Sequence, residues 1–216
     1  GVLIQVGHVE RFNPAIAAIH DYDLDPKFIE AHRLSQFKPR ATDVSVVHDL
    51  MIHDIDILLW LVKSKVKTVD ANGVNVLTDT TDIANARIKF ENGAVANLTA
   101  SRISAHPMRK MRIFQKDTYL SIDFGVPEVE VYKIHDAEES PKSGIPASML
   151  GTIEAGVRNK NIYFQKPEVP KLNAIGEEQN AFAKAIMDGS PIPVRAEEAA
   201  EALRVAQIIS DLVMPE

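Results

Sequence analysis

The sequence of 216 residues contains no cysteine. This absence excludes disulfide bridges and thiolate metal sites, and it gives no indication of a secreted protein. No uninterrupted apolar run approaches the roughly 18 residues of a membrane-spanning helix, and the N-terminus lacks the basic and apolar regions of a signal peptide. We therefore expect a cytoplasmic protein with no membrane partner.

An excess of positive charge is also lacking, because 24 Lys and Arg residues stand against 30 Asp and Glu residues, for a net charge of −6. Nucleic acids and anionic membranes select for basic patches, so neither is expected as a partner. The ten glycines are scattered, and none belongs to the G-x-G-x-x-G turn of dinucleotide-binding folds. The chain alone should therefore bind a dinucleotide weakly or not at all.

The most informative stretch that is present is Ser45 to Val62, which has the apolar character of a buried helix of about five turns. At 3.6 residues per turn, Asp49, His53 and Asp56 fall within about 60° of one another. Buried ionisable groups are costly unless they are paired, hydrogen-bonded or in use. The polar stripe therefore predicts the wall of a functional site.

After this helix the apolar period changes from 3.6 to 2, which indicates strands. The turn Glu91-Asn92-Gly93 predicts a hairpin, and the alternating alanines on its two sides predict a sheet face packed on the long helix. We expect an α+β fold with a predominantly antiparallel sheet of about six strands and helices on one face. The expected strands are 67–77, 83–90, 94–102, 108–114, 119–124 and 129–134.

Five further segments carry local signals. They are a buried strand over Val2–Val6, a short helix capped by Asn13 with Pro14 at its first position, a strand over Phe28–Ser35, and two C-terminal helices with apolar stripes over 172–186 and 199–213. Asp136 to Lys171 is rich in Pro, Gly, Lys and Glu, and only Asn161–Gln165 has a strand pattern. This segment is expected to be a long loop.

Two motifs, VGHVERFNP at Val6–Pro14 and DLMIHDID at Asp49–Asp56, resemble the C-terminal part of the Gfo/Idh/MocA oxidoreductases, in particular those acting on UDP-N-acetylglucosamine. The resemblance covers nearly the whole chain. It implies a dihydrodipicolinate-reductase-like C-terminal domain over residues 13–216 and, in residues 1–12, the remnant of the last strand and exit loop of a missing Rossmann domain. That missing domain would hold NAD or NADP and the family's catalytic lysine, whose Glu-Lys-Pro motif does not occur here.

The resemblance implies that the full-length protein transfers hydride between a sugar or UDP-sugar hydroxyl carbon and nicotinamide. The family's D-x-x-x-H pair matches Asp49 and His53. Histidine titrates near neutral pH, so His53 could accept the hydroxyl proton or orient the hydroxyl for the missing lysine. Asp49 could bind a neighbouring hydroxyl or hold the imidazole. The alternative is a locally paired Asp49 and a hydrogen-bonded core histidine.

His8 and Arg11 lie where the last Rossmann strand would end, the place where parallel sheets bind ligands. They could contact the nicotinamide or the substrate. Alternatively, they could belong to a helix-entry loop in which Arg11 pairs with Glu10 or another carboxylate.

Three more residues are candidate substrate contacts. Arg33 has a fork that matches diphosphate oxygens, Asp56 belongs to the polar stripe, and Tyr163 could line a nucleotide pocket. For Arg33 a salt bridge, and for Tyr163 aromatic packing, is the competing interpretation. A metal held by the carboxylates and imidazole of the stripe is possible in principle. No metal site is predicted, because the resemblance gives these residues a metal-free role.

A sheet face left uncovered by the chain's own helices would pair with another copy, so a homo-oligomer is expected. Gly1 in place of Met indicates a fragment or a processed product. A different hypothesis is that the chain is a stand-alone sugar-binding or assembly module without catalytic activity.

Overall fold

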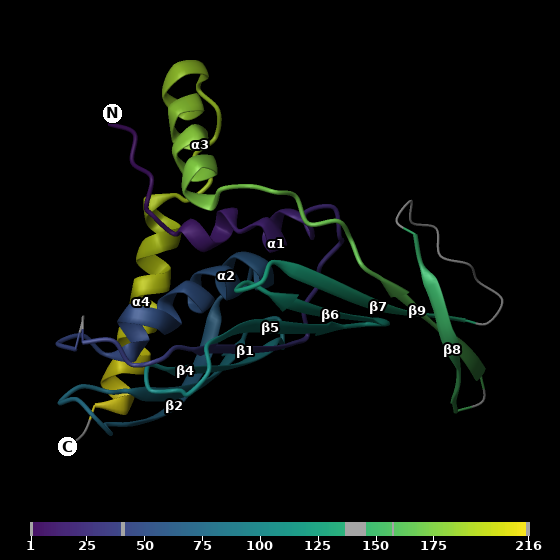
Figure 1. Cartoon of the computed structure of the whole chain (residues 1–216), viewed down its shortest axis with the longest axis horizontal. Helices are drawn as coiled ribbons and strands as arrows, with labels where there is room; N and C mark the ends of the chain where they lie inside the picture. Colours follow the sequence, from purple (N-terminus) through teal and green to yellow (C-terminus); the bar gives the residue numbers. More distant parts are fainter. Residues whose placement is uncertain (1, 40–41, 137–145, 157, 215–216) are drawn as a thin grey trace.

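The computed structural model describes residues 2–39, 42–136, 146–156 and 158–214. Its strands are β1 (Phe28–Leu34), β2 (Val66–Val74), β3 (Ile83–Phe90), β4 (Val95–Ser101), β5 (Met108–Gln115), β6 (Thr118–Asp123), β7 (Glu128–Asp136), β8 (Ser148–Ala155) and β9 (Arg158–Gln165). Its helical segments are the 3₁₀ turn η1 (Val9–Phe12), α1 (Pro14–Ala17), the π turn η2 (Val47–Met51), α2 (Ile52–Val62), α3 (Ala174–Asp188) and α4 (Ala196–Val213). Figure 1 shows the helices gathered on one side of one large sheet.

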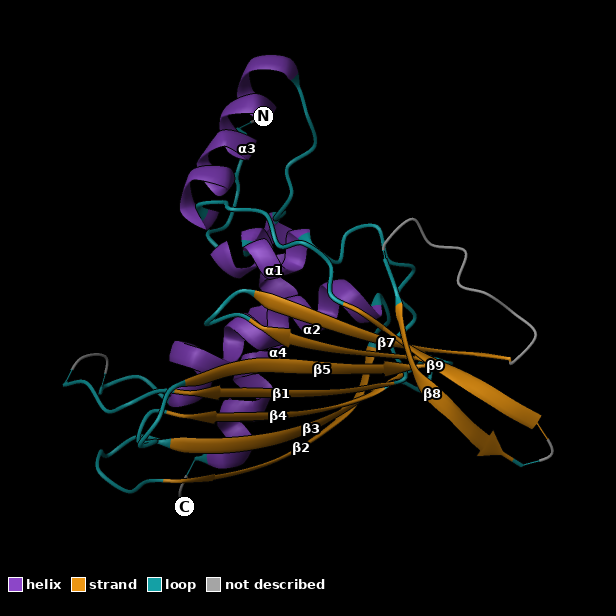
Figure 2. Ribbon diagram, turned by 45° about the vertical axis from the view of Figure 1, so that its right-hand side comes forward, coloured by secondary structure: helices purple, strands orange, loops and turns teal. Residues whose placement is uncertain are grey.

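The sheet has the strand order β2-β3-β4-β1-β5-β6-β7-β9-β8. Its helix-covered face carries the core, because the alternate residues that point to this face are nearly inaccessible to solvent. These residues include Ala84, Ala86, Ile88, Phe90, Ala96, Leu98, Ala100, Met111, Ile113, Leu120 and Ile122. Figure 2 shows α2 and α4 on this face. The expected α+β class and the packing of the hairpin face under the long helix are confirmed.

The sheet contains more strands than the six expected. β1 enters the middle of the sheet, where it pairs in parallel with β4 and antiparallel with β5. The predicted hairpin is present between β3 and β4, and its Gly93 has a φ of 86°, which favours glycine. The expected antiparallel pairing of consecutive strands is therefore confirmed for β2-β3-β4 and for β5-β6-β7, and it fails between β4 and β5, which β1 separates.

Two sequence-based expectations about backbone structure are wrong. Residues Val2–Val6 form no strand, since Val6 N–H donates to the Val194 carbonyl and no neighbouring strand is present among the described residues to complete a ladder. Within 136–171, where a long loop was expected, β8 and β9 form a hairpin that pairs with β7 and projects from the body of the molecule, and the strand pattern over Asn161–Gln165 falls on β9. Residues 137–145 of the expected loop lie outside the described residues.

The helices follow their capping signals more closely. The Asn13 side chain accepts a hydrogen bond from the Ala15 N–H at the start of α1, and Asn173 caps α3 in the same way. α4 buries the expected small and branched residues, although Leu203, expected on the buried face, is 51% exposed. α3 differs, because Ala185 is its one buried residue and its apolar stripe faces solvent. No helix among the described residues is long and apolar enough to cross a membrane.

Candidate functional site

The predicted polar stripe lies at the junction of η2 and α2. The first turn of the long helix is a π turn, Val47–Met51, and the regular α-helix begins only at Ile52. Such π turns are frequent at functional sites because they shift the side chains that follow out of the regular helical spacing. Asp54 faces Arg33 on β1 and Asp56 faces Arg11 on η1, and the two residues are 4% and 1% exposed. Both carboxylates must therefore be compensated inside the protein.

Arg33 compensates the first carboxylate. Its Nε and Nη2 donate to the two oxygens of Asp54 at 2.9 and 2.7 Å, and its Nη1 donates to Glu10 Oε1 at 2.9 Å. Burial alone would raise the pKa of Glu10, but the Arg33 guanidinium outweighs burial and lowers it. The three side chains form a buried carboxylate–guanidinium–carboxylate triad, which joins η1, β1 and α2.

Arg11 compensates the second carboxylate in the same way. Its Nε and Nη2 donate to Asp56 at 2.8 and 2.7 Å, and its Nη1 donates to Glu198 Oε2 at 2.7 Å. Burial opposes the charge of Arg11, but its two carboxylate partners raise the pKa overall. This second triad joins η1 to α2 and to the first turn of α4. Of the two interpretations of Arg11, the geometry agrees with pairing to a carboxylate.

His53 lies beside the first triad and has a different environment. Its Nδ1 atom is buried and has no hydrogen-bond partner in the part of the chain that the structure describes. Burial, reinforced by the nearby Arg33 charge, lowers the pKa of His53, so the imidazole is neutral at physiological pH. No hydrogen bond joins it to Asp49 among the described residues. A neutral imidazole with an unsatisfied nitrogen can accept a hydrogen bond or a proton from a ligand.

His8 precedes η1 and approaches the same region. It is 8% exposed, and its Nε2 lies 3.9 Å from Asp56 Oδ1. Burial raises the pKa of Glu178 on α3, and the charge of His8 opposes that rise. His8 thus lies beside Asp56 and is also among the groups that act electrostatically on His53.

Two of the candidate substrate contacts do not fit their expected roles. Arg33 is 3% exposed and uses its three donor groups on Asp54 and Glu10, so it presents no free edge to a diphosphate. Tyr163 lies on β9, where its ring packs edge-on against His135 at 5.6 Å, in the part of the sheet that projects away from α2. The alternatives of a salt bridge for Arg33 and of aromatic packing for Tyr163 agree with the structure.

The metal alternative also finds no support. Both Asp56 oxygens already accept hydrogen bonds from Arg11. Among the described residues, no three His, Asp or Glu side chains are grouped so that they could hold a metal ion.

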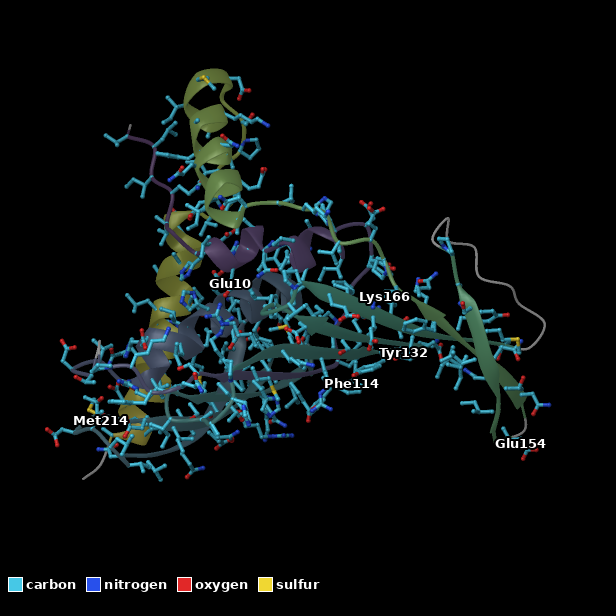
Figure 3. All side chains as sticks on the ribbon, in the orientation of Figure 1. Glu10, Phe114, Tyr132, Glu154, Lys166 and Met214 are labelled. Carbon is cyan, nitrogen blue, oxygen red and sulfur yellow. The ribbon has the colours of Figure 1, made fainter. Side chains whose placement is uncertain are left out.

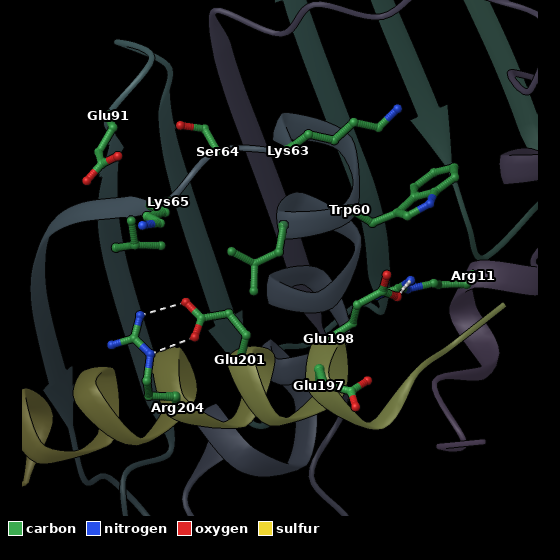
Figure 4. A pocket seen from close by; sticks show the side chains of 12 residues that line it. Arg11, Trp60, Lys63, Ser64, Lys65, Glu91, Glu197, Glu198, Glu201 and Arg204 are labelled. Carbon is green, nitrogen blue, oxygen red and sulfur yellow. Dashed lines mark hydrogen bonds and ion pairs between the residues drawn. The ribbon is translucent and has the colours of Figure 1, made fainter. Parts of the chain in front are cut away.

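Arg11 also lines a pocket of about 850 Å³ (Figure 4). Trp60 and the C-terminal end of α2 form one wall, and Glu197, Glu198 and Glu201 on α4 form another. Glu201 and Arg204 are paired with each other at the pocket edge. Neither His53 nor Asp49 lines this pocket, so it is not the space that their side chains face.

Sequence reasoning named Glu10 only as a possible partner of Arg11 and did not single out Glu198 or Asp54. Glu10 stands next to Arg11 in the sequence, yet it pairs with Arg33, and the partner of Arg11 on α4 is 187 positions away. The available signal was the excess of carboxylates over cations in the two motifs, which required distant arginines. Figure 3 labels Glu10, which belongs to η1.

The fold and the cluster define a class of protein. Residues 15–120 match the sequence model of the GFO/IDH/MocA C-terminal domain, and the chain belongs to this family through that domain.

Among individual relatives, the UDP-N-acetylglucosamine 3-dehydrogenase of Acidithiobacillus ferrooxidans is 37% identical over 192 residues, which are 88% of this chain and 56% of that protein. A solved structure of that enzyme covers 99% of this chain with a TM-score of 0.83 and 31% identity, and this chain covers 62% of it. The scyllo-inositol dehydrogenase of Lactobacillus casei, solved with NAD(H) and scyllo-inositol, has the same fold at 19% identity, with a TM-score of 0.65, and 97% of this chain and 62% of that chain are covered. The chain therefore spans a little over half the length of these relatives.

Proposed function

We propose that the chain is the substrate-binding and oligomerisation domain of an NAD(P)-dependent oxidoreductase that acts on a hydroxyl group of a sugar or UDP-sugar. The observation that carries the proposal is the half-buried, neutral imidazole of His53 beside the first arginine triad, on a chain 37% identical to a UDP-N-acetylglucosamine 3-dehydrogenase. A sugar hydroxyl is a suitable partner for the accessible edge of this ring, because it can donate a hydrogen bond and release a proton.

His53 would act on the hydroxyl group of the carbon from which hydride departs to the nicotinamide. As the carbon–oxygen bond gains double-bond character, the hydroxyl proton becomes acidic, and the neutral imidazole can accept it. Asp49, one helical turn earlier, would bind a neighbouring hydroxyl. The two arginine triads hold α2 and η1 fixed, so that the imidazole keeps one orientation toward the substrate.

The described residues do not by themselves fit a dinucleotide. No strand among them leads through a glycine-rich turn into a helix, and Arg11, one of the two expected cofactor contacts, has its guanidinium occupied by Asp56 and Glu198. His8 remains a candidate contact at the end of the segment before η1. We therefore assign NAD or NADP to a separate domain of the full-length protein and expect no tight binding to this chain.

An exposed apolar surface supports the presence of that domain. Val2, Leu3 and Ile4 in the N-terminal segment and Ile175, Ile186 and Met187 on α3 are 48% to 90% exposed. The two segments are held together, since Gln5 Nε2 donates to the Glu178 carbonyl at 3.0 Å. Figure 1 shows α3 and the N-terminus extending from the same side of the body. Residues 1–12 would complete the last strand of the missing domain, and residues 13–216 would form the substrate domain.

The competing function is a stand-alone sugar-binding or assembly module. For either function we propose a cytoplasmic location, because the chain lacks cysteine. The two functions differ in catalysis. Assaying the full-length protein with UDP-N-acetylglucosamine and NAD⁺ or NADP⁺ separates them, since binding without nicotinamide reduction would favour the module.

The decisive variant is His53→Gln in the same assay, with His48→Gln as a matched control on the preceding π turn. We expect His53→Gln to lower kcat by roughly a hundredfold or more, as for the loss of a general base, and His48→Gln to leave it little changed. Equal turnover by the two variants would remove His53 from the reaction.

A further inference from the structure

Exposed basic side chains gather at one end of the sheet, although the protein as a whole is acidic. At this end β1 and β4 finish and β5 begins, because Leu34 is paired with both Ser101 and Met108. The loops that leave there are joined, since Ser104 N–H donates to the Ser35 carbonyl and Gln36 Nε2 donates to the Ala105 carbonyl, both at 2.9 Å.

Lys38 and His106 are exposed on these two loops, and Arg109 follows on β5. We call Lys38, His106 and Arg109 the basic rim. Since neighbouring charges reinforce one another, such a group raises the local concentration of anionic ligands even on an acidic protein.

Arg109 is the member of the basic rim that is tied to the candidate site. It is the register partner of Arg33, so the two side chains share the helix-covered face of the sheet. Both guanidinium groups approach the same oxygen of Glu10. Arg33 hydrogen-bonds it at 2.9 Å, whereas Arg109 lies further away, at 3.8 Å. The strand holds the Arg109 backbone in place, because its carbonyl accepts from the Phe124 N–H at 2.8 Å.

The two arginines differ in what they can offer a ligand. The side chain of Arg33 is 4% exposed and makes three short hydrogen bonds, whereas that of Arg109 is 54% exposed and makes the one long contact with Glu10. Glu10 is already compensated by Arg33, so Arg109 is not required to neutralise it. A guanidinium in this state can turn its fork toward a phosphate group and bind two oxygens at once.

Resting on the proposed function, we propose that Arg109, assisted by Lys38 and His106, binds the diphosphate of a nucleoside diphosphate sugar. The diphosphate lies at the rim of the sheet, and the sugar extends along Glu10 toward His53. Arg109 thereby takes the role for which Arg33 is unsuited, and it selects sugar nucleotides over free sugars.

Isothermal titration of UDP into the 216-residue chain tests the proposal without cofactor or turnover. We expect Arg109→Gln to weaken UDP binding roughly ten- to hundredfold, the loss of one charge-assisted contact, and Arg109→Lys to restore part of it. The matched control is Arg112→Gln, since Arg112 lies on the same strand, is 46% exposed and pairs with Glu30 on the opposite face at 3.0 Å.

UDP binding that is unchanged in Arg109→Gln, equally weakened in Arg112→Gln, or absent from the wild-type chain would overturn the proposal. The proposed function is judged separately by turnover of the full-length protein. Turnover of UDP-N-acetylglucosamine with the same KM in Arg109→Gln would leave the oxidoreductase function standing and refute the phosphate site.

Discussion

The side chain of Arg33 is 4% exposed and satisfies two carboxylates from different elements. Such a buried charge group contributes little net stability compared with apolar packing, but the loss of one member leaves the others uncompensated. Arg33, Glu10 and Asp54 therefore act as one unit, and their shared effect is to fix η1 against α2 beside His53.

We expect Asp54→Ala to lower the free energy of unfolding by about 3–5 kcal/mol, because Arg33 would lose two of its three hydrogen bonds inside the protein. Urea unfolding of the chain, followed by circular dichroism, measures the change. The control is Asp25→Ala, which breaks a pair with Lys27 whose side chains are 70% and 54% exposed; there the change should be below about 1 kcal/mol. Equal losses in both variants would contradict a special role for burial.

The helical period of the sequence predicted a polar stripe on the long helix, but not the charged residues on other elements that pair with its carboxylates. The 3.6-residue period alone places His53 and Asp56 on one stripe. Arg33 and Glu198 could not be assigned to their partners, because these contacts depend on the position of β1 in the sheet and of α4 across α2. Glu10 pairs with Arg33 and not with its sequence neighbour Arg11, since consecutive residues of the η1 turn point in different directions.

At the scale of elements, the loop between β2 and β3 is organised by Asp82. This side chain is fully buried, and its Oδ2 accepts from the backbone N–H groups of Val76, Leu77 and Thr78 at 2.7 to 3.0 Å. Burial would raise its pKa, but these donors bring the pKa down to about 2. Arg102 binds the carbonyls of Val44 and Thr81 next to this loop and so connects it to the entry of η2.

Asp82→Ala should destabilise the chain by about 2–4 kcal/mol, since it leaves several buried donors without an acceptor. Thermal unfolding compared with Asp79→Ala, an exposed position in the same loop, provides the measurement. The stabilisation requires the ionised carboxylate. It is complete above the ordinary Asp pKa near 3.8 and is lost as the pH falls from there to about 2. A wild-type protein with unchanged stability across this range would contradict it.

Capping and turn residues in the sequence predicted where helices and hairpins form better than they predicted which strands pair with each other. The Asn13 cap and the Asn92-Gly93 turn act within a few residues, and both were predicted. The hairpin of β8 and β9 was missed because its register shifts between Met149 and Gly151, which interrupts the alternation that marks a strand. Val2–Val6 has strand character, but an isolated strand has no ladder partner.

At the scale of the whole molecule, the uncovered face of the sheet carries a row of half-buried aromatic rings. Phe28, Phe114, Tyr119, Tyr132 and Phe164 follow one another across five neighbouring strands, with ring centroids 4.9 to 5.9 Å apart. An apolar row of this length on an uncovered sheet is typical of an interface, so we retain the prediction of a homo-oligomer through this face.

Tyr119→Lys tests this surface, because it places a charge in the middle of the row. We expect the wild-type chain to sediment as a dimer or larger species and Tyr119→Lys to shift toward the monomer at equal concentration. Gln207→Lys, which adds the same side chain at an exposed position on α4, should sediment as the wild type does. A wild-type monomer throughout the micromolar range would argue against the interface.

The central place of β1 also determines when the protein can fold during synthesis. Phe28 is paired with Val95 on one side and with Phe114 on the other, so the first strand of this sheet to be made must wait for partners that are more than 60 residues further along the chain. Pairings between distant segments slow folding, because the loop between them must close first. Until β4 and β5 have left the ribosome, β1 and the apolar face of α2 have nothing to pack against, and this interval is when the nascent chain would most need a chaperone.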